Sequence, residues 1–136
     1  MKKLMFIAAF TALVNLSFAQ KLQKGNLIGV HVLTVTLKPG VTMEQFKTFY
    51  LSKSIPAYEI AFKGTKGFLL DGRRGESKDK LAIAWHFETE QDRDKFFKED
   101  GFTDMGNAAV AAVSDVDKEL EKLGTSTDVF TDWVIQ

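Results

Sequence analysis

The segment from Leu27 to Leu37 alternates as a β-strand does, and both of its faces are largely apolar. The two sets are Ile28, Val30, Val32, Thr34 and Thr36 on one face, and Leu27, Gly29, His31, Leu33, Val35 and Leu37 on the other. A strand of this kind is stable only when other layers cover both of its sides. The chain must therefore build at least one sheet that is packed on two faces.

The segment from Lys80 to Glu88 has the same property. It places Leu81, Ile83, Trp85 and Phe87 on one side and the small residues Ala82 and Ala84 on the other. A shorter strand is predicted from Gly67 to Leu70, and the polar, glycine-containing stretch between the two segments is typical of a hairpin connection. A last strand is predicted from Asp128 to Ile135.

Helices are predicted between these strands. Thr42 to Gln45 is a capping-box pattern, so a helix should begin there and run to about Phe62, with a kink or break near Ser54–Pro56. A second helix should begin at Thr89 and end at Gly101, because a cap residue opens the segment and glycine closes it. A longer helix is predicted within 104–123, where apolar residues recur at intervals of three and four.

The resulting order, β-α-β-β-α-(α)-β, predicts an α+β fold of the ferredoxin-like split β-α-β-β-α-β type. Such a fold has a four-stranded antiparallel sheet with helices on one face. The segment 27–136 is long enough for one such domain and one hydrophobic core, and it leaves no room for a second.

At this point the chain resembles the dimeric α/β-barrel superfamily, which includes antibiotic-biosynthesis-monooxygenase-like, EthD-like, NIPSNAP-like and stress-responsive barrel domains. The resemblance rests on element order, on Lys38-Pro39-Gly40-Val41-Thr42 before the first helix, and on Phe87-Glu88-Thr89-Glu90 after the third strand. The extra helix before the last strand departs from the minimal pattern. The resemblance implies a fold and a homodimer, with the helix-free sheet face packed on a second copy. It does not imply an activity.

The residues favour the homodimer independently of that resemblance. One helix layer covers only one face of the sheet, although the first and third strands are apolar on both. In a monomer, the other face would expose an apolar patch larger than the roughly 300–600 Å² typical of soluble monomers.

The first nineteen residues have the layout of a secretory signal peptide. Lys2 and Lys3 precede an apolar run from Leu4 to Leu16, and Ser17-Phe18-Ala19 supplies the small residues that a signal peptidase requires. The run is too short to span a membrane. We therefore expect cleavage near Ala19-Gln20 and export of the mature protein, either to the periplasm or out of the cell.

Composition excludes several functions. Loss of Lys2 and Lys3 would change the formal charge of the chain from 0 to −2, which gives no basic footprint for nucleic acid and no polybasic membrane anchor. The absence of cysteine excludes a thiolate nucleophile, a cysteine-based zinc site and a lipid anchor at the cleavage site. No metal ligand set or cofactor motif is recognisable, so no cofactor is predicted.

The two histidines, His31 and His86, are the candidate catalytic residues. They lie on strands that should be antiparallel neighbours, so they could meet at one end of the sheet. Whether they share a face depends on strand register, which sequence does not specify. They could act as a general base, a haem ligand or half of a metal site, or be two unrelated histidines of the core and the surface.

Five further residues are candidate ligand contacts: Trp85, Glu88, Tyr50, Trp133 and Arg73. His86 and Glu88 could border the space that Ala82 and Ala84 leave, unless helix side chains fill it. The aromatic residues, with Tyr58, could line a cavity for a flat molecule or simply pack in the core. Arg73 could bind an anion or belong to a solvated hairpin tip.

The residues leave three functions open. The first is an exported homodimer that binds a small hydrophobic or aromatic molecule without catalysis. The second is a cofactor-independent monooxygenase or isomerase with His86 or His31 as its base. The third is haem binding through one of the histidines.

Overall fold

A four-stranded antiparallel sheet in the order β2-β3-β1-β6 is the framework of the fold. The structure is a computed structural model that describes residues 21–136; the predicted signal peptide lies outside them. The elements, in chain order, are β1 (Leu27–Leu37), α1 (Met43–Phe49), the π-helix η1 (Tyr50–Ser54), α2 (Ile55–Ala61), β2 (Lys66–Asp71), β3 (Leu81–Phe87), α3 (Glu90–Asp94), β4 (Phe97–Lys98), β5 (Gly101–Phe102), α4 (Asp104–Glu121) and β6 (Gly124–Val134).

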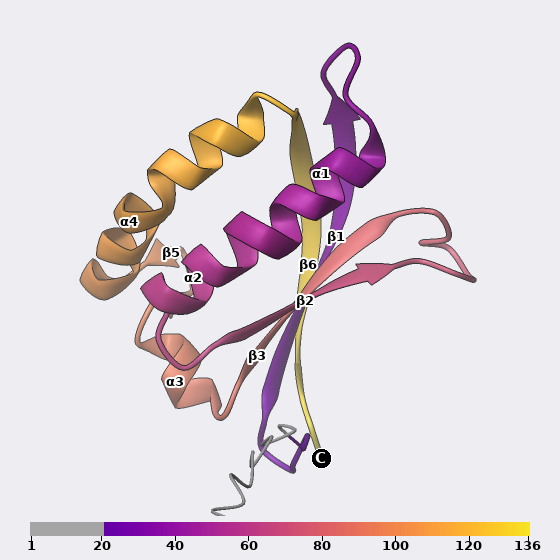
Figure 1. The fold of residues 1–136 in the computed structure, drawn as a ribbon. Coiled ribbons are helices and arrows are strands. Elements are labelled where there is room, and N and C mark those ends of the chain that lie inside the picture. Colours follow the sequence, from indigo (N-terminus) through magenta and orange to yellow (C-terminus); the bar gives the residue numbers. More distant parts are fainter. Residues whose placement is uncertain (1–20) are drawn as a thin grey trace, which may run out of the picture.

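The helices α1, α2 and α4 lie on one side of this sheet, as Figure 1 shows, and the opposite face carries no helix among the described residues. This arrangement confirms the predicted α+β, ferredoxin-like fold. Within residues 21–136 no helix is both long enough and apolar enough to cross a lipid bilayer.

Strand register determines which side chains face the helices. His31 of β1 lies opposite Ile83 of β3, and His86 of β3 lies opposite Ile28 of β1. Because directly opposite residues share a face and successive residues alternate, the two histidines lie on opposite faces of the sheet. The odd-numbered residues of β1 and β3 and the even-numbered residues of β6 face the helices. We call the other side the open face.

The first helix begins as predicted. The Gln45 amide donates a hydrogen bond to Thr42 Oγ1 (3.2 Å), and the Thr42 amide donates one to Gln45 Oε1 (2.8 Å), which together form the capping box. Near Ser54–Pro56, where a kink or break is predicted, the α-helix gives way to the π-helix η1, in which the Ile55 amide reaches back to the Tyr50 carbonyl, and the chain stays helical. This wider turn accommodates a proline that has no N–H to donate.

Two element boundaries differ from the sequence-based predictions. The helix expected from Thr89 to Gly101 ends at Asp94 and is followed by the short β4–β5 hairpin. The residues after Asp94 offer no apolar stripe at helical spacing, whereas the hairpin packs Phe97 against the core. The last strand begins at Gly124 rather than at Asp128, because it pairs with β1 over its whole length.

The core consists of two clusters of buried side chains. One contains Leu33, Phe46, Tyr50, Ile55, Leu81 and Ile83. The other contains Leu27, Phe62, Phe87, Phe96 and Ala109. Trp85 is partly buried and packs against both, so it bridges the two parts of the core. Between the clusters, β1 supplies Gly29 and His31 in place of large apolar side chains, and the interior is hollow there.

Candidate functional site

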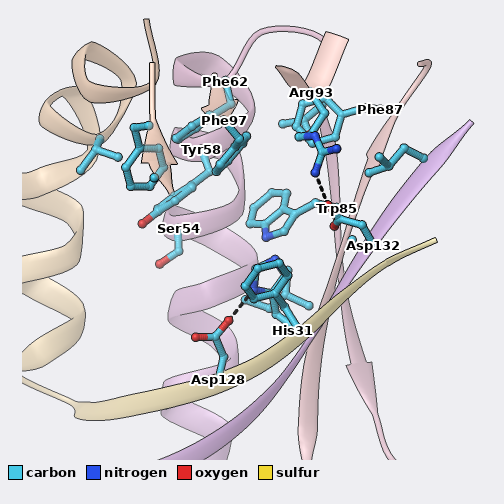
Figure 2. Close-up of a pocket in the computed structure, with 18 of the residues that line it drawn as sticks. His31, Ser54, Tyr58, Phe62, Trp85, Phe87, Arg93, Phe97, Asp128 and Asp132 are labelled. Carbon is cyan, nitrogen blue, oxygen red and sulfur yellow. Dashed lines mark hydrogen bonds and ion pairs between the residues drawn. The ribbon is translucent and has the colours of Figure 1, made fainter. Parts of the chain in front are cut away.

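A cavity of about 1220 Å³ lies between the sheet and the helices. Its wall comes from the helix-facing residues of β1, β3 and β6, from η1, α2 and α4, and from the segment that contains α3 and the β4–β5 hairpin (Figure 2). Its aromatic lining consists of Tyr50, Tyr58, Phe62, Trp85, Phe87, Phe97, Phe102 and Phe130. The volume somewhat exceeds the roughly 300–1,000 Å³ typical of small-molecule sites.

The aromatic side chains form a stacked wall. The ring of Tyr58 lies 5.6 Å from that of Trp85 and 5.7 Å from that of Phe62, with near-parallel planes. The ring of Phe97 in turn stacks on that of Phe62, at 5.6 Å. Such a row presents flat apolar faces to a flat ligand, and the favoured geometry for a further ring is an offset stack or an edge contact.

His31 projects from β1 into the cavity and pairs with a carboxylate of β6. Its Nδ1 lies 2.5 Å from Asp128 Oδ2, and its ring stacks on Phe130 at 5.1 Å (Figure 2). Because a carboxylate only accepts hydrogen bonds, Nδ1 carries the proton of the neutral ring and Nε2 is left as an acceptor. Asp128 thereby orients the imidazole.

The space next to His31 Nε2 exists because residue 29 is glycine. A Cβ built on Gly29 would lie 3.8 Å from His31 Nε2 and 2.8 Å from Asp132 Oδ1. Both groups therefore border the same small volume on the helix-facing side of β1. A larger residue at position 29 would displace the Asp132 carboxylate.

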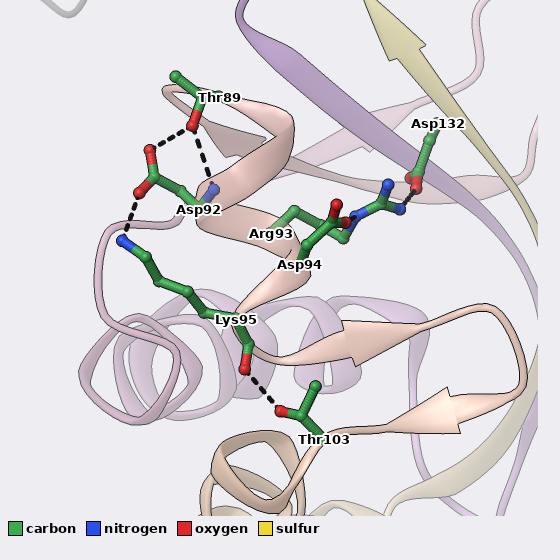
Figure 3. Close-up of polar contacts among 7 residues, drawn as sticks. All are labelled: Thr89, Asp92, Arg93, Asp94, Lys95, Thr103 and Asp132. Carbon is green, nitrogen blue, oxygen red and sulfur yellow. Dashed lines mark hydrogen bonds and ion pairs between the residues drawn. The ribbon is translucent and has the colours of Figure 1, made fainter.

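Arg93 pairs with two carboxylates at the α3 side of the cavity. Its Nη1 donates to Asp132 Oδ2, and its Nε donates to Asp94 Oδ1 at 2.7 Å (Figure 3). The N-cap residue Thr89, which accepts from the Asp92 amide at 3.1 Å, holds the α3 helix that carries Arg93. The ion pair of Arg93 with Asp132 links α3 to the edge strand β6 across the cavity wall.

A further carboxylate, that of Asp117, lines the cavity from α4. The Tyr58 hydroxyl lies 3.1 Å from Asp117 Oδ1 and 3.0 Å from Oδ2, and it donates to this carboxylate. Burial raises the pKa of Asp117, an effect that the Tyr58 hydrogen bond opposes and the nearby Glu121 reinforces. Burial and the Asp117 charge likewise raise the pKa of Tyr58, so its hydroxyl stays protonated as the donor.

Ser54, the last residue of η1, also lines the cavity and is buried at 2% exposure. Its Oγ has no hydrogen-bond partner among the described residues. Buried hydroxyl groups are normally satisfied, so this one is available to a bound molecule.

The structure places three of the predicted site residues in the cavity: His31, Tyr50 and Trp85. The other four lie elsewhere. His86 and Trp133 are on the open face, and Glu88 is an exposed residue after β3. Burial lowers the pKa of His86, and the Glu88 carboxylate only partly opposes this effect. Arg73 lines a separate hollow of about 230 Å³ at the β2–β3 connection and pairs with Asp71 at 3.6 Å.

The space beside Ala82 and Ala84 that was expected to adjoin His86 is therefore on the open face rather than under the helices. Sequence reasoning did not identify the acidic residues of the cavity, Asp117, Asp128 and Asp132. One signal was present: Asp128 and Asp132 alternate with Phe130 on one face of the last strand, and that face proves to be the one under the helices.

A metal site is not evident in the described part of the chain. Among residues 21–136, no group of three or more histidine or acidic side chains could hold a metal ion. The cavity instead combines aromatic faces with a few oriented polar groups.

Fold and cavity together define an α+β protein of the ferredoxin-like split type with an aromatic pocket under its helices. No family model matches the sequence. No curated protein matches it either.

Solved structures with a similar fold were found. One is the cofactor-independent oxygenase SnoaB of Streptomyces nogalater, with 16% identity, a TM-score of 0.47 and coverage of 82% of this chain and 94% of that chain. A dimeric protein of unknown function with a ferredoxin-like fold from Bacteroides fragilis has 12% identity, a TM-score of 0.43 and coverages of 82% and 98%. An uncharacterised NIPSNAP-like domain protein from Burkholderia xenovorans has 10% identity, a TM-score of 0.47 and coverages of 84% and 86%. The resemblance is at the level of the fold only.

Proposed function

We propose that this protein binds a flat, mainly apolar aromatic molecule in the cavity between its sheet and its helices. The observation that supports the proposal is the cavity itself, about 1220 Å³ in volume and lined by eight aromatic side chains. Polar groups such as His31, Ser54 and Asp117 lie among these aromatic side chains, and polar groups within a mainly aromatic lining are usual in a small-molecule site.

The two tryptophans allow a matched test, because Trp85 lines the cavity whereas Trp133 is on the open face and 61% exposed. Binding of naphthylmethanol, a flat neutral probe, is measured by isothermal titration calorimetry. We expect Trp85→Leu to weaken binding about tenfold, since a stacked aromatic pair contributes about 0.5–1.5 kcal/mol beyond its buried area. Trp133→Leu should leave the affinity unchanged. The opposite pattern would place the ligand on the open face and contradict the proposal.

The His31–Asp128 pair favours a second function, proton abstraction from the bound molecule. Asp128 accepts from Nδ1 at 2.5 Å, so Nε2 is the ring nitrogen that can take a proton from an acidic hydroxyl or C–H group. This is the arrangement that a cofactor-independent oxygenase or isomerase would need from its base.

Oxygen uptake with a panel of electron-rich quinols tests this function. We expect His31→Ala to lower the rate by about 10²–10⁴-fold, the usual contribution of a general base. His86→Ala is the matched control, because that histidine lies on the other face of the sheet. If the protein consumes oxygen and His31→Ala consumes it at the same rate, His31 is not the base.

Haem binding is the third alternative, and the cavity offers only His31 as an imidazole ligand among the described residues that line it. Haemin titration should then produce a Soret shift that His31→Ala abolishes and His86→Ala preserves. A titration without a spectral shift would dismiss haem as the ligand.

We also propose that the protein is a homodimer that closes through the open face of the sheet. Four large apolar side chains on this face are exposed: Phe68, Leu70, Val129 and Trp133. A second copy would remove them from water at about 25 cal/mol per Å² of apolar surface. Light scattering at micromolar concentration should give the mass of two subunits, and the mass of one would refute the proposal.

Export after removal of residues 1–19 remains our proposal for the location of the protein. It rests on the charged start, the apolar run and the Ser17-Phe18-Ala19 site. N-terminal sequencing of the protein from the producing organism should begin at Gln20. A mature chain that still begins at Met1 would disprove it.

A further inference from the structure

The charges that line the cavity are predominantly negative. The acidic residues of the lining are Asp94, Glu99, Asp117, Asp128 and Asp132, whereas Arg93 and Lys98 are its only permanently basic residues within the described chain. An excess of carboxylates in a partly enclosed space attracts cations and repels anions, because the low dielectric of the walls strengthens the field.

Most of these carboxylates already have partners. Asp94 and Asp132 pair with Arg93, and Asp128 accepts from His31. Glu99 is an exposed residue of the β4–β5 turn, where water solvates it. None of these four needs a ligand to compensate its charge.

Asp117 differs from the others. None of the ion pairs formed by residues 21–136 includes it. Among the described residues its one hydrogen-bond donor is the Tyr58 hydroxyl, which supplies a single proton to a carboxylate that can accept about four bonds. Burial disfavours this charge, as the raised pKa of Asp117 indicates. The carboxylate is thus partly desolvated and lacks a counter-charge.

A second polar group near Tyr58 is also unsatisfied. Ser54 lies four residues before Tyr58 on the same helical segment, and such pairs share one face of a helix. Its buried Oγ has no partner among the described residues. Figure 2 shows the hydroxyl groups of Ser54 and Tyr58 on the same side of this helix. A group that donates several hydrogen bonds would satisfy both Ser54 and Asp117.

We propose that the ligand of the cavity carries a cationic amino group, and that Asp117 and Ser54 recognise this group while the aromatic wall binds the rest of the molecule. The inference rests on the proposed function, since it concerns the same cavity. An ammonium group has three donors and no acceptor, which matches a carboxylate and a free hydroxyl oxygen.

Three probes of one shape and different charge test the inference: naphthylmethylamine, naphthylmethanol and naphthylacetate. Calorimetry on the unmodified protein should give an affinity for the amine about tenfold higher than for the alcohol, and the lowest affinity for the acetate. High salt should reduce the advantage of the amine and leave the alcohol unaffected, because screening weakens only the charged interaction.

Asp117→Asn removes the charge and keeps the shape of the side chain. It should lower the affinity for the amine to that for the alcohol, which itself should stay within about twofold. Asp115→Asn is the matched control, since this exposed aspartate of the same helix pairs with Lys118 outside the cavity. Circular dichroism verifies that each variant is folded. If Asp117→Asn does not fold, the salt series on the unmodified protein tests the inference in its place.

The outcomes separate the two proposals. Equal binding of amine and alcohol would overturn the cationic inference while the proposed aromatic site stands. A preference for the amine that persists in folded Asp117→Asn would overturn the role of Asp117. Failure of all three probes to bind would count against the aromatic site, and the inference about its charge would fall with it.

Discussion

At the scale of single residues, the two histidines have opposite environments. His31 has a carboxylate partner in a cavity, whereas His86 is buried on the open face with neither ring nitrogen hydrogen-bonded to a described residue. Burial lowers the pKa of His86 from its ordinary value of 6.5, and Glu88 acts in the opposite direction with the smaller effect. The folded ring therefore resists a proton that the unfolded chain accepts.

This difference predicts a loss of stability in acid. Below about pH 6.5 the unfolded chain binds more protons than the native state, so the unfolding free energy falls as the pH falls from 6.5 to the lowered pKa of His86, and this loss levels off below that pKa. We expect denaturant unfolding between about pH 7.5 and pH 5 to show a smaller loss in His86→Gln than in the unmodified protein. Equal losses in both proteins would show that His86 does not contribute.

At the scale of elements, the shape of the cavity depends on how closely β2 approaches β3 and the first helical segment. Gly67 of β2 lies opposite Trp85, and a Cβ at this position would lie 2.4 Å from a Trp85 ring carbon and 2.9 Å from Ile55 Cγ2. Because Gly67 has no side chain, the indole of Trp85 can lie over β2, where it contacts both core clusters.

Gly67→Ala should therefore displace Trp85, because a Cβ 2.4 Å from the ring leaves the indole no room in its present position. We expect the unfolding free energy to fall by about 1–3 kcal/mol, the usual cost of overpacking. In a Trp133→Phe background, where Trp85 is the sole tryptophan, the emission maximum should shift as well. An alanine variant with unchanged stability and emission would mean that the ring is not held against the strand.

At the scale of the whole molecule, the open face is the interface of the proposed homodimer. Val129 on this face and Ile60 on the helix side are matched in exposure, at 77% and 75%. Val129→Asp would bury a charge in the proposed dimer, at a cost that several hydrogen bonds would be needed to offset. We expect it to give a single-subunit mass in light scattering, while Ile60→Asp leaves the mass of two subunits. Dissociation by both variants, or by neither, would contradict this interface.

Local signals explain how much of the fold could be predicted. Alternation in β1 and β3, the Thr42–Gln45 capping box and the hairpin before β3 each act over a few residues, so the sequence shows them directly. The same reasoning failed between Asp94 and Gly101, where Phe96 and Phe97 suggest a helix anchored to the core, although Phe97 begins a hairpin.

The sequence by itself determined the kinds of elements, their order, and the need to cover both faces of the central strands. Only the tertiary structure decided which residues meet. A shift of one residue in register reverses every side chain of a strand, so sequence alone could not place His31 beneath the helices and His86 on the open face. The partner of His31, Asp128, lies 97 residues away in the chain, and only the pairing of β1 with β6 brings the two together.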